Sequence, residues 1–166
     1  MSRPATDGAA GARPRARAYT WRVRVLFLDV DGVLNRVGFK PEEPDGLASW
    51  IEPELAARLT ALVRETGAVV VMSSSWREDE ALEDLRAELA RAGVDVPLVD
   101  STPVLFGLPR WAEIEAWCDA NHPARFVIVD DLHDMGPLAA YHVRTSVLTG
   151  LDDDAAAAAR ALLTAP

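Results

Sequence analysis

Short apolar runs alternate with amphipathic stretches along most of this 166-residue chain. The runs predict strands, and the amphipathic stretches predict helices because their apolar residues recur with the helical period. The expected strands span residues 23–29, 68–72, 94–99, 126–129 and 141–145. The expected helices lie within residues 47–66, 78–92, 109–120 and 152–163. Such alternation is typical of a parallel sheet with helices on both faces, so we expect an α/β protein with a doubly wound, five-stranded parallel sheet.

The chain is strongly acidic overall, although its first residues are basic. It has 26 acidic and 17 basic residues, which gives a formal net charge of -9. Residues 1–24 hold six arginines and one aspartate, a net charge of +5, which leaves -14 for residues 25–166. A body with this charge disfavours sequence-independent binding to a nucleic-acid backbone.

The arginines of the N-terminal segment lie among alanine, glycine and proline, with no apolar period over residues 2–17. This composition predicts a disordered arm over residues 1–20, followed by a single domain over residues 21–166. Two alternatives stay open for these arginines: they bind an anionic partner, or they are simply solvated.

Several classes of protein are excluded or disfavoured by the composition. The single cysteine, Cys118, excludes a disulfide framework and a cysteine-based zinc cluster within one chain. No apolar stretch approaches the ~20 residues that a membrane-spanning helix needs, so we expect no membrane partner. The N-terminal arginines are not followed by the apolar stretch of a signal peptide, so we expect a cytoplasmic protein. The sequence leaves the oligomeric state open.

Polar side chains gather where the predicted strands end, which is where ligands bind in sheets of this type. The candidate site residues are Asp29, Asp31, Ser73, Ser74, Arg110, Asp130 and Asp131. Neighbouring aspartates are costly to ionise unless a cation lies among them, and Mg²⁺ prefers oxygen ligands. A serine hydroxyl and an arginine are suited to hold a phosphoryl group. One carboxylate could then attack phosphorus while a second transfers protons.

Each of these features also has a simpler explanation when it is taken alone. An aspartate pair or a run of serines after a strand is often only a turn or a helix cap. Arg110 could pair with Glu113 or Glu115 on its own predicted helix. Their shared position at the strand ends favours a functional site.

The same residues resemble the motifs of the haloacid dehalogenase-like (HAD) superfamily. LFLDVDGVLN (26–35) resembles its first motif, MSSSW (72–76) the second, and VIVDD (127–131) the acidic fourth, while Arg110 stands at the third. The likeness is closest to the HAD domain of Swiss-Army-Knife RNA-repair proteins and covers roughly residues 22–163. It is carried further by SSSWR (73–77), RWAEIEAW (110–117) and VRTSVLTGLDDD (143–154).

The resemblance implies a Rossmann-like hydrolase that uses Mg²⁺. Asp29 would be the nucleophile, which forms an aspartyl-phosphate and also ligates the metal. Asp31 would be the general acid and base, with its backbone carbonyl on the metal. Asp130 would ligate Mg²⁺ directly, and Asp131 would ligate it or orient a metal-bound water.

The resemblance also implies how phosphate is held and which substrates fit. Ser73 or Ser74 would bind the phosphoryl oxygens, and counting back from Trp76 favours Ser74. Arg110 would offset negative charge at a position where the family usually has lysine. Residues 33–50 are too few for a cap domain, so we expect a capless or minimally capped, open site.

An open site suits a nucleotide, a polynucleotide end or a small phosphomonoester, and we expect such a phosphorylated molecule as the partner. The leading hypothesis is a HAD-type phosphatase. The alternative is a non-catalytic phosphate- or partner-binding module that retains the HAD fold and the metal site.

Overall fold

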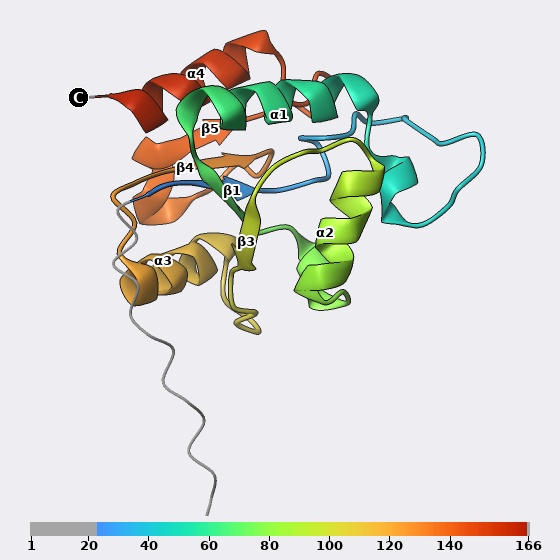
Figure 1. Cartoon of the computed structure of the whole chain (residues 1–166). Coiled ribbons are helices and arrows are strands. Elements are labelled where there is room, and N and C mark those ends of the chain that lie inside the picture. Colours follow the sequence, from blue (N-terminus) through green and yellow to red (C-terminus); the bar gives the residue numbers. More distant parts are fainter. Residues whose placement is uncertain (1–22, 166) are drawn as a thin grey trace, which may run out of the picture.

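The computed structural model describes residues 23–165 and shows a five-stranded sheet covered by helices (Figure 1). The expected N-terminal arm lies outside the described residues. The strands are β1 (Arg24–Leu28), β2 (Val69–Met72), β3 (Leu98–Ser101), β4 (Arg125–Asp130) and β5 (His142–Arg144). Neighbouring strands pair in parallel in the order β3-β2-β1-β4-β5. The predicted fold class is therefore confirmed.

The helices follow the predicted order, with boundaries set partly by proline. They are α1 (Pro53–Thr66), α2 (Leu82–Arg91), α3 (Arg110–Asn121) and α4 (Asp153–Thr164), with the short 3-10 helices η1 (Leu47–Trp50), η2 (Ser75–Glu78) and η3 (Gly136–Tyr141). Pro53 begins α1 because proline fits only the first turn of a helix, so the interval expected to be helical from residue 47 is divided. The third strand begins after Pro97, not at residue 94, because proline donates no hydrogen bond to a neighbouring strand.

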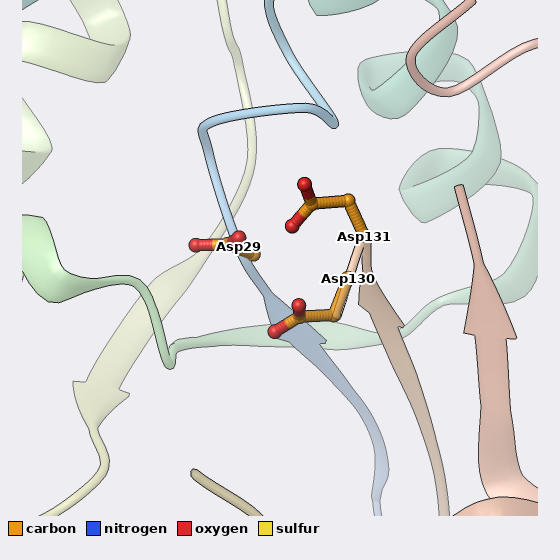
Figure 2. Close-up of side chains that lie close together, drawn as sticks. All are labelled: Asp29, Asp130 and Asp131. Atoms are coloured by element: carbon orange, nitrogen blue, oxygen red, sulfur yellow. The ribbon is translucent and has the colours of Figure 1, made fainter. Parts of the chain in front are cut away.

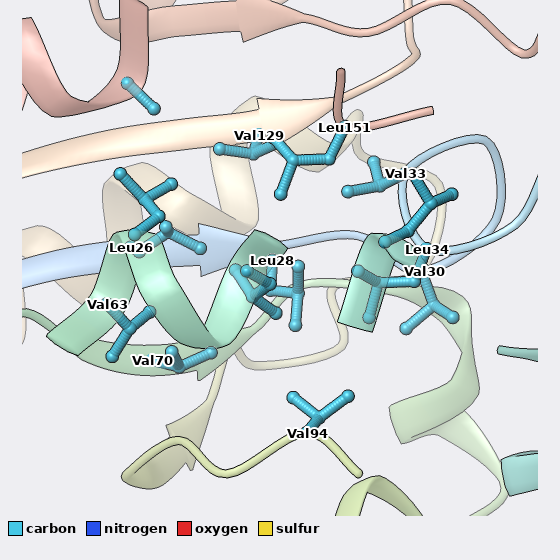
Figure 3. Packing of buried hydrophobic residues seen from close by; sticks show 14 of the residues in the cluster. Leu26, Leu28, Val30, Val33, Leu34, Val63, Val70, Val94, Val129 and Leu151 are labelled. Carbon is cyan, nitrogen blue, oxygen red and sulfur yellow. The ribbon is translucent and has the colours of Figure 1, made fainter. Parts of the chain in front are cut away.

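Alternating side chains of β1 point to opposite faces of the sheet and into separate cores. Leu26 and Leu28 join Val70 and Val129 in a cluster covered by α1 and α4, and Figure 3 shows this packing from close by. α2 adds its buried leucines to the same cluster. Phe27, on the other face, packs among residues of α3 and η3. In Figure 1, α1 and α4 lie above the sheet and α3 below it.

The strand order creates one place where the chain changes direction across the sheet. The chain runs from β1 outward to β2 and β3, and then returns to place β4 on the other side of β1. The carboxyl ends of β1 and β4 therefore lie side by side at the topological switch point, where sheets of this type bind ligands.

The connection between β1 and α1 forms an open loop and the short helix η1, which project to one side of the sheet (Figure 1). Within residues 23–165 no inserted cap domain interrupts the element order. None of the helices described in this range is long and apolar enough to cross a membrane.

Candidate active site

Three carboxylates converge at the switch point between β1 and β4. Asp29 directly follows β1, Asp130 ends β4, and Asp131 comes next. One oxygen from each lies within 4.8 Å of the others, and Figure 2 shows the three side chains turned toward a common space. Asp29 is only 5% exposed and Asp130 is 0% exposed. We call Asp29, Asp130 and Asp131 the acidic cluster.

The backbone holds these carboxylates in place. The amide of Asp29 donates to the carbonyl of Val129 at 3.0 Å, so the strand pairing of β1 and β4 continues into the site. The Oδ1 atom of Asp130 accepts a hydrogen bond from the amide of Leu132 at 2.9 Å. The pairing of β1 with β4 thus sets the position of Asp29 relative to Asp130 and Asp131.

Gly32 allows the loop after β1 to pass against Asp131. Its φ is +72°, and a Cβ at this position would lie 2.7 Å from Oδ2 of Asp131. Glycine is therefore needed here both for the left-handed backbone conformation and for the close approach.

Arg110 supplies positive charge from the first residue of α3. Its Nη1 atom lies 2.9 Å from Oδ1 of Asp29 and donates to Oδ2 of Asp130 at 2.7 Å. The simpler alternative for Arg110 is wrong, because its carboxylate partners are not Glu113 or Glu115 but two members of the acidic cluster. Among the residues that the structure describes, Arg110 is the one arginine that forms ion pairs with the acidic cluster, so a single guanidinium faces three carboxylates.

The imbalance of charge is visible in the pKa values of the cluster. Burial, together with the charge of Asp130, raises the pKa of Asp29 from its ordinary value of 3.8 to about 6. Arg110, the amide of Val30 and the hydroxyl of Ser74 oppose this rise in the Asp29 pKa without cancelling it. Burial and the charge of Asp130 also raise the pKa of Asp131. The cluster therefore favours the addition of a proton or a cation.

The two candidate serines differ in their surroundings. Both follow β2 and are fully buried. The hydroxyl of Ser74 hydrogen-bonds Asp29 and accepts a hydrogen bond from the amide of Trp76. The hydroxyl of Ser73 has no hydrogen-bond partner among the residues that the structure describes. Ser74 is thus the serine hydroxyl in contact with the expected nucleophile.

Asp31 lies outside the acidic cluster and is exposed. Its Oδ2 atom accepts a hydrogen bond from the indole nitrogen of Trp76 at 3.1 Å, and its Oδ1 atom accepts one from Asn35 at 2.9 Å. Asn35 also accepts a hydrogen bond from the amide of Gly32 at 2.9 Å. The Asp31 carboxylate is therefore held at the rim of the site by two side chains to which sequence reasoning gave no role.

A buried ion pair beneath the site also escaped sequence reasoning. The Arg77 side chain is 2% exposed and pairs with Glu113 of α3. Arg77 also donates to the carbonyls of Ser73 and Ser74, at 2.9 and 2.8 Å, and to the carbonyl of Thr102 at 3.1 Å. Arg77 thus joins the residues that follow β2 to the loop after β3 and to α3, the helix that carries Arg110. The only sequence signal was an arginine two positions after the serine run, at the end of the SSSWR stretch.

One of three comparisons with known proteins gave a match. Neither the curated proteins nor the solved structures gave a match. A family described as the HAD domain in Swiss Army Knife RNA repair proteins matches residues 25–156, a range that holds every candidate site residue. HAD domains form a superfamily of hydrolases and phosphatases, and the five-stranded parallel sheet with acids at its switch point has the HAD-like fold. The chain therefore belongs to the family of HAD domains in Swiss Army Knife RNA repair proteins.

Proposed function

We propose that this chain is a Mg²⁺-dependent phosphomonoester hydrolase that works through an aspartyl-phosphate on Asp29. The observation that carries the proposal is the acidic cluster, in which three carboxylates face one guanidinium and two of the three are almost fully buried. Such an arrangement is unfavourable by itself and is relieved by a divalent cation.

The donor set of the cluster fits Mg²⁺. Asp29, Asp130 and Asp131 offer carboxylate oxygens, which are the ligands that Mg²⁺ prefers, and the backbone carbonyl of Asp31 is the further ligand that the family likeness implies. When bound, the metal would neutralise these carboxylates together with the charge of the phosphoryl group.

The phosphoryl group would be held by residues that already contact Asp29. Arg110 reaches Asp29 from α3, and the hydroxyl of Ser74 reaches it from the end of β2. Guanidinium and hydroxyl groups bind phosphate oxygens well, and here both would lie beside the attacking oxygen. We infer that Ser74, not Ser73, supplies the hydroxyl.

The chemistry would proceed in two displacements. An oxygen of ionised Asp29 forms a bond to phosphorus while the bond from phosphorus to the leaving oxygen breaks, and Asp31 gives that oxygen a proton. Water then attacks phosphorus, Asp31 takes a proton from it, and the bond from phosphorus to Asp29 breaks to release inorganic phosphate. The hydrogen bonds from Trp76 and Asn35 would orient Asp31 for both transfers.

The substrate class follows from the open site and the family. Without a cap domain in the described chain, the reacting phosphate can belong to a large molecule. The family name refers to RNA repair, which favours a nucleotide or a polynucleotide end over a sugar phosphate. The charge of -14 on residues 25–166 favours contact with the end of a strand over contact along its length.

The test is phosphate release with and without Mg²⁺ from phenyl phosphate, mononucleotides and oligonucleotides phosphorylated at either end. We expect release that needs Mg²⁺ and that falls by several orders of magnitude in Asp29→Asn. Asp134→Asn is the matched control, because this nearby exposed carboxylate accepts a hydrogen bond from the amide of Gly136 and lies outside the cluster. Turnover that survives Asp29→Asn would contradict the mechanism. Mg²⁺ binding without turnover on any substrate would favour the non-catalytic binding module.

A further inference from the structure

A polar groove of about 390 Å³ adjoins the acidic cluster. It is lined by Asp131, Arg144, Thr145, Ser146 and Val147, so one wall belongs to the cluster and the rest follows β5. Arg144 pairs in register with Asp130 across β4 and β5, which places the end of β5 beside the reacting centre. A substrate held at Asp29 would have this groove as a neighbour.

Arg144 differs from the other arginines near the site because no carboxylate neutralises it. Its Nε atom donates to the backbone carbonyl of Asp131 at 3.2 Å, which anchors the guanidinium at the groove. In residues 23–165 it forms no ion pair, and its two terminal nitrogens have no hydrogen-bond partner. By contrast, Arg36 and Arg110 are each paired with two carboxylates. A guanidinium with two available nitrogens is the side chain best suited to bidentate contact with a phosphate.

The groove also offers a hydroxyl, and a hydrogen bond joins it to the loop after β1. The hydroxyl oxygen of Ser146 accepts a hydrogen bond from the amide of Leu148 at 3.2 Å, which leaves its proton available for a ligand. The hydroxyl of buried Thr145 donates to the carbonyl of Gly32 at 2.8 Å, so the floor of the groove is joined to the loop after β1. The position of the groove relative to Asp29 is therefore defined by the fold.

We propose that this groove binds a second phosphate of the substrate, one nucleotide away from the phosphate that reacts at Asp29. The ligand chemistry is a phosphomonoester that carries another phosphate nearby, as in the phosphorylated end of a strand or in a nucleoside 3′,5′-bisphosphate. This inference rests on the proposed function, because it takes the acidic cluster as the place where the first phosphate reacts.

The surroundings limit the site to one additional phosphate. A second groove of about 690 Å³ continues from the same residues, Arg144 to Ser146, along α4. Its lining includes the carboxylates of Asp152 and Asp154, which would repel a third phosphate. A strand should therefore gain affinity from its second phosphate and little from those that follow.

The experiment compares kcat/KM for phenyl phosphate, a nucleoside 5′-monophosphate, a nucleoside 3′,5′-bisphosphate, and 5′-phosphorylated di- and trinucleotides. We expect the dinucleotide or the bisphosphate to exceed the monophosphate by about tenfold, and the trinucleotide to add less than twofold. Arg144→Gln should remove this advantage and leave phenyl phosphate unchanged. Arg86→Gln is the matched control, because among the described residues the exposed guanidinium of Arg86 also donates only to backbone carbonyls. These carbonyls belong to β3, which lies at the opposite edge of the sheet from β5. Whether the dinucleotide or the bisphosphate gains more identifies the source of the second phosphate.

A binding measurement tests the second phosphate site independently of the proposed catalysis. Fluorescence anisotropy with a labelled 5′-phosphorylated dinucleotide, in Mg²⁺, should show about tenfold weaker binding for Arg144→Gln than for wild type. If no substrate is hydrolysed but this difference remains, the proposed catalysis is contradicted and the second phosphate site is supported. Equal binding and equal kinetics in both proteins would overturn the site. An equal loss on phenyl phosphate would also overturn it, because Arg144 would then act on the reacting phosphate.

Discussion

Replacement of the expected nucleophile should make the metal-free protein more stable at neutral pH. Asp29 is 5% exposed and lies beside Asp130, and its pKa is raised to about 6 by burial and by that neighbouring charge. Ionised Asp29 therefore destabilises the folded state, even though Arg110 contacts it. Asparagine has nearly the same shape and no charge, so Asp29→Asn should remove this cost.

The magnitude and its pH dependence follow from the two pKa values. In the unfolded chain Asp29 loses its proton near its ordinary pKa of 3.8, whereas in the folded protein it keeps the proton up to about pH 6. The free energy of unfolding of wild type should therefore fall as pH rises through this window and level off above it. The difference between the two pKa values corresponds to about 3 kcal/mol. Asp29→Asn does not titrate, so the variant should match wild type near pH 4 and exceed it by up to about 3 kcal/mol above pH 6.

Urea denaturation of both proteins in EDTA, from about pH 4 to about pH 7.5, measures this difference, and the values near pH 4 serve as the internal control. Addition of Mg²⁺ at the upper pH should narrow the gap, because a ligand that binds only the folded wild type stabilises it by mass action. A gap that does not change with pH would refute the reasoning. A wild type that is the more stable protein at neutral pH would refute it as well, because the attraction of Arg110 would then exceed the cost of burial.

Two further predictions concern the frame around the site. Arg77→Met should lower the free energy of unfolding by about 3–5 kcal/mol, because it leaves Glu113 buried without its partner. Arg91→Met removes two ion pairs of an exposed arginine and should hardly move the urea midpoint. Gly32→Ala and Gly38→Ala both place alanine at positive φ, and each should lower the free energy of unfolding by about 1–3 kcal/mol. Of these two positions, the new Cβ meets a carboxylate of the acidic cluster at Gly32 alone, where it would lie 2.7 Å from Asp131. Calorimetric titration should therefore show weakened Mg²⁺ binding for Gly32→Ala alone, and equal binding by both variants would contradict the close approach.

The fold class and the shared edge of the candidate residues were predictable, because both follow from local patterns. Apolar runs with helical segments between them require a parallel sheet, and a parallel sheet places its strand ends along one edge. Asp29 and Asp130 had to share that edge once both were assigned to strand ends. Their position side by side depends on the strand order, which the sequence pattern alone did not give.

The partners of individual charged side chains were not predictable in the same way. Arg110 could reach Glu113 on its own helix, but in the structure Glu113 pairs with Arg77, which is 36 residues away along the chain. Likewise, nothing in the spacing of Asp31 and Trp76 indicates that an indole N–H, 45 residues away, binds that carboxylate. Such choices depend on which loops the sheet brings together, and the hydrophobic period carries no information about them.

Three arginines at one edge of the sheet show how charge balance separates structural from functional groups. Arg77 is buried, has one carboxylate partner and uses its remaining donors on backbone carbonyls, so its charge and hydrogen-bonding capacity are satisfied without a ligand. Arg110 faces a cluster with more carboxylates than it can neutralise, and such a place favours a cation. Arg144 has no carboxylate partner among the described residues and lines an open groove, and such a place favours an anion. A cation site and an anion site side by side are what a metal-assisted reaction of a molecule with two phosphates requires.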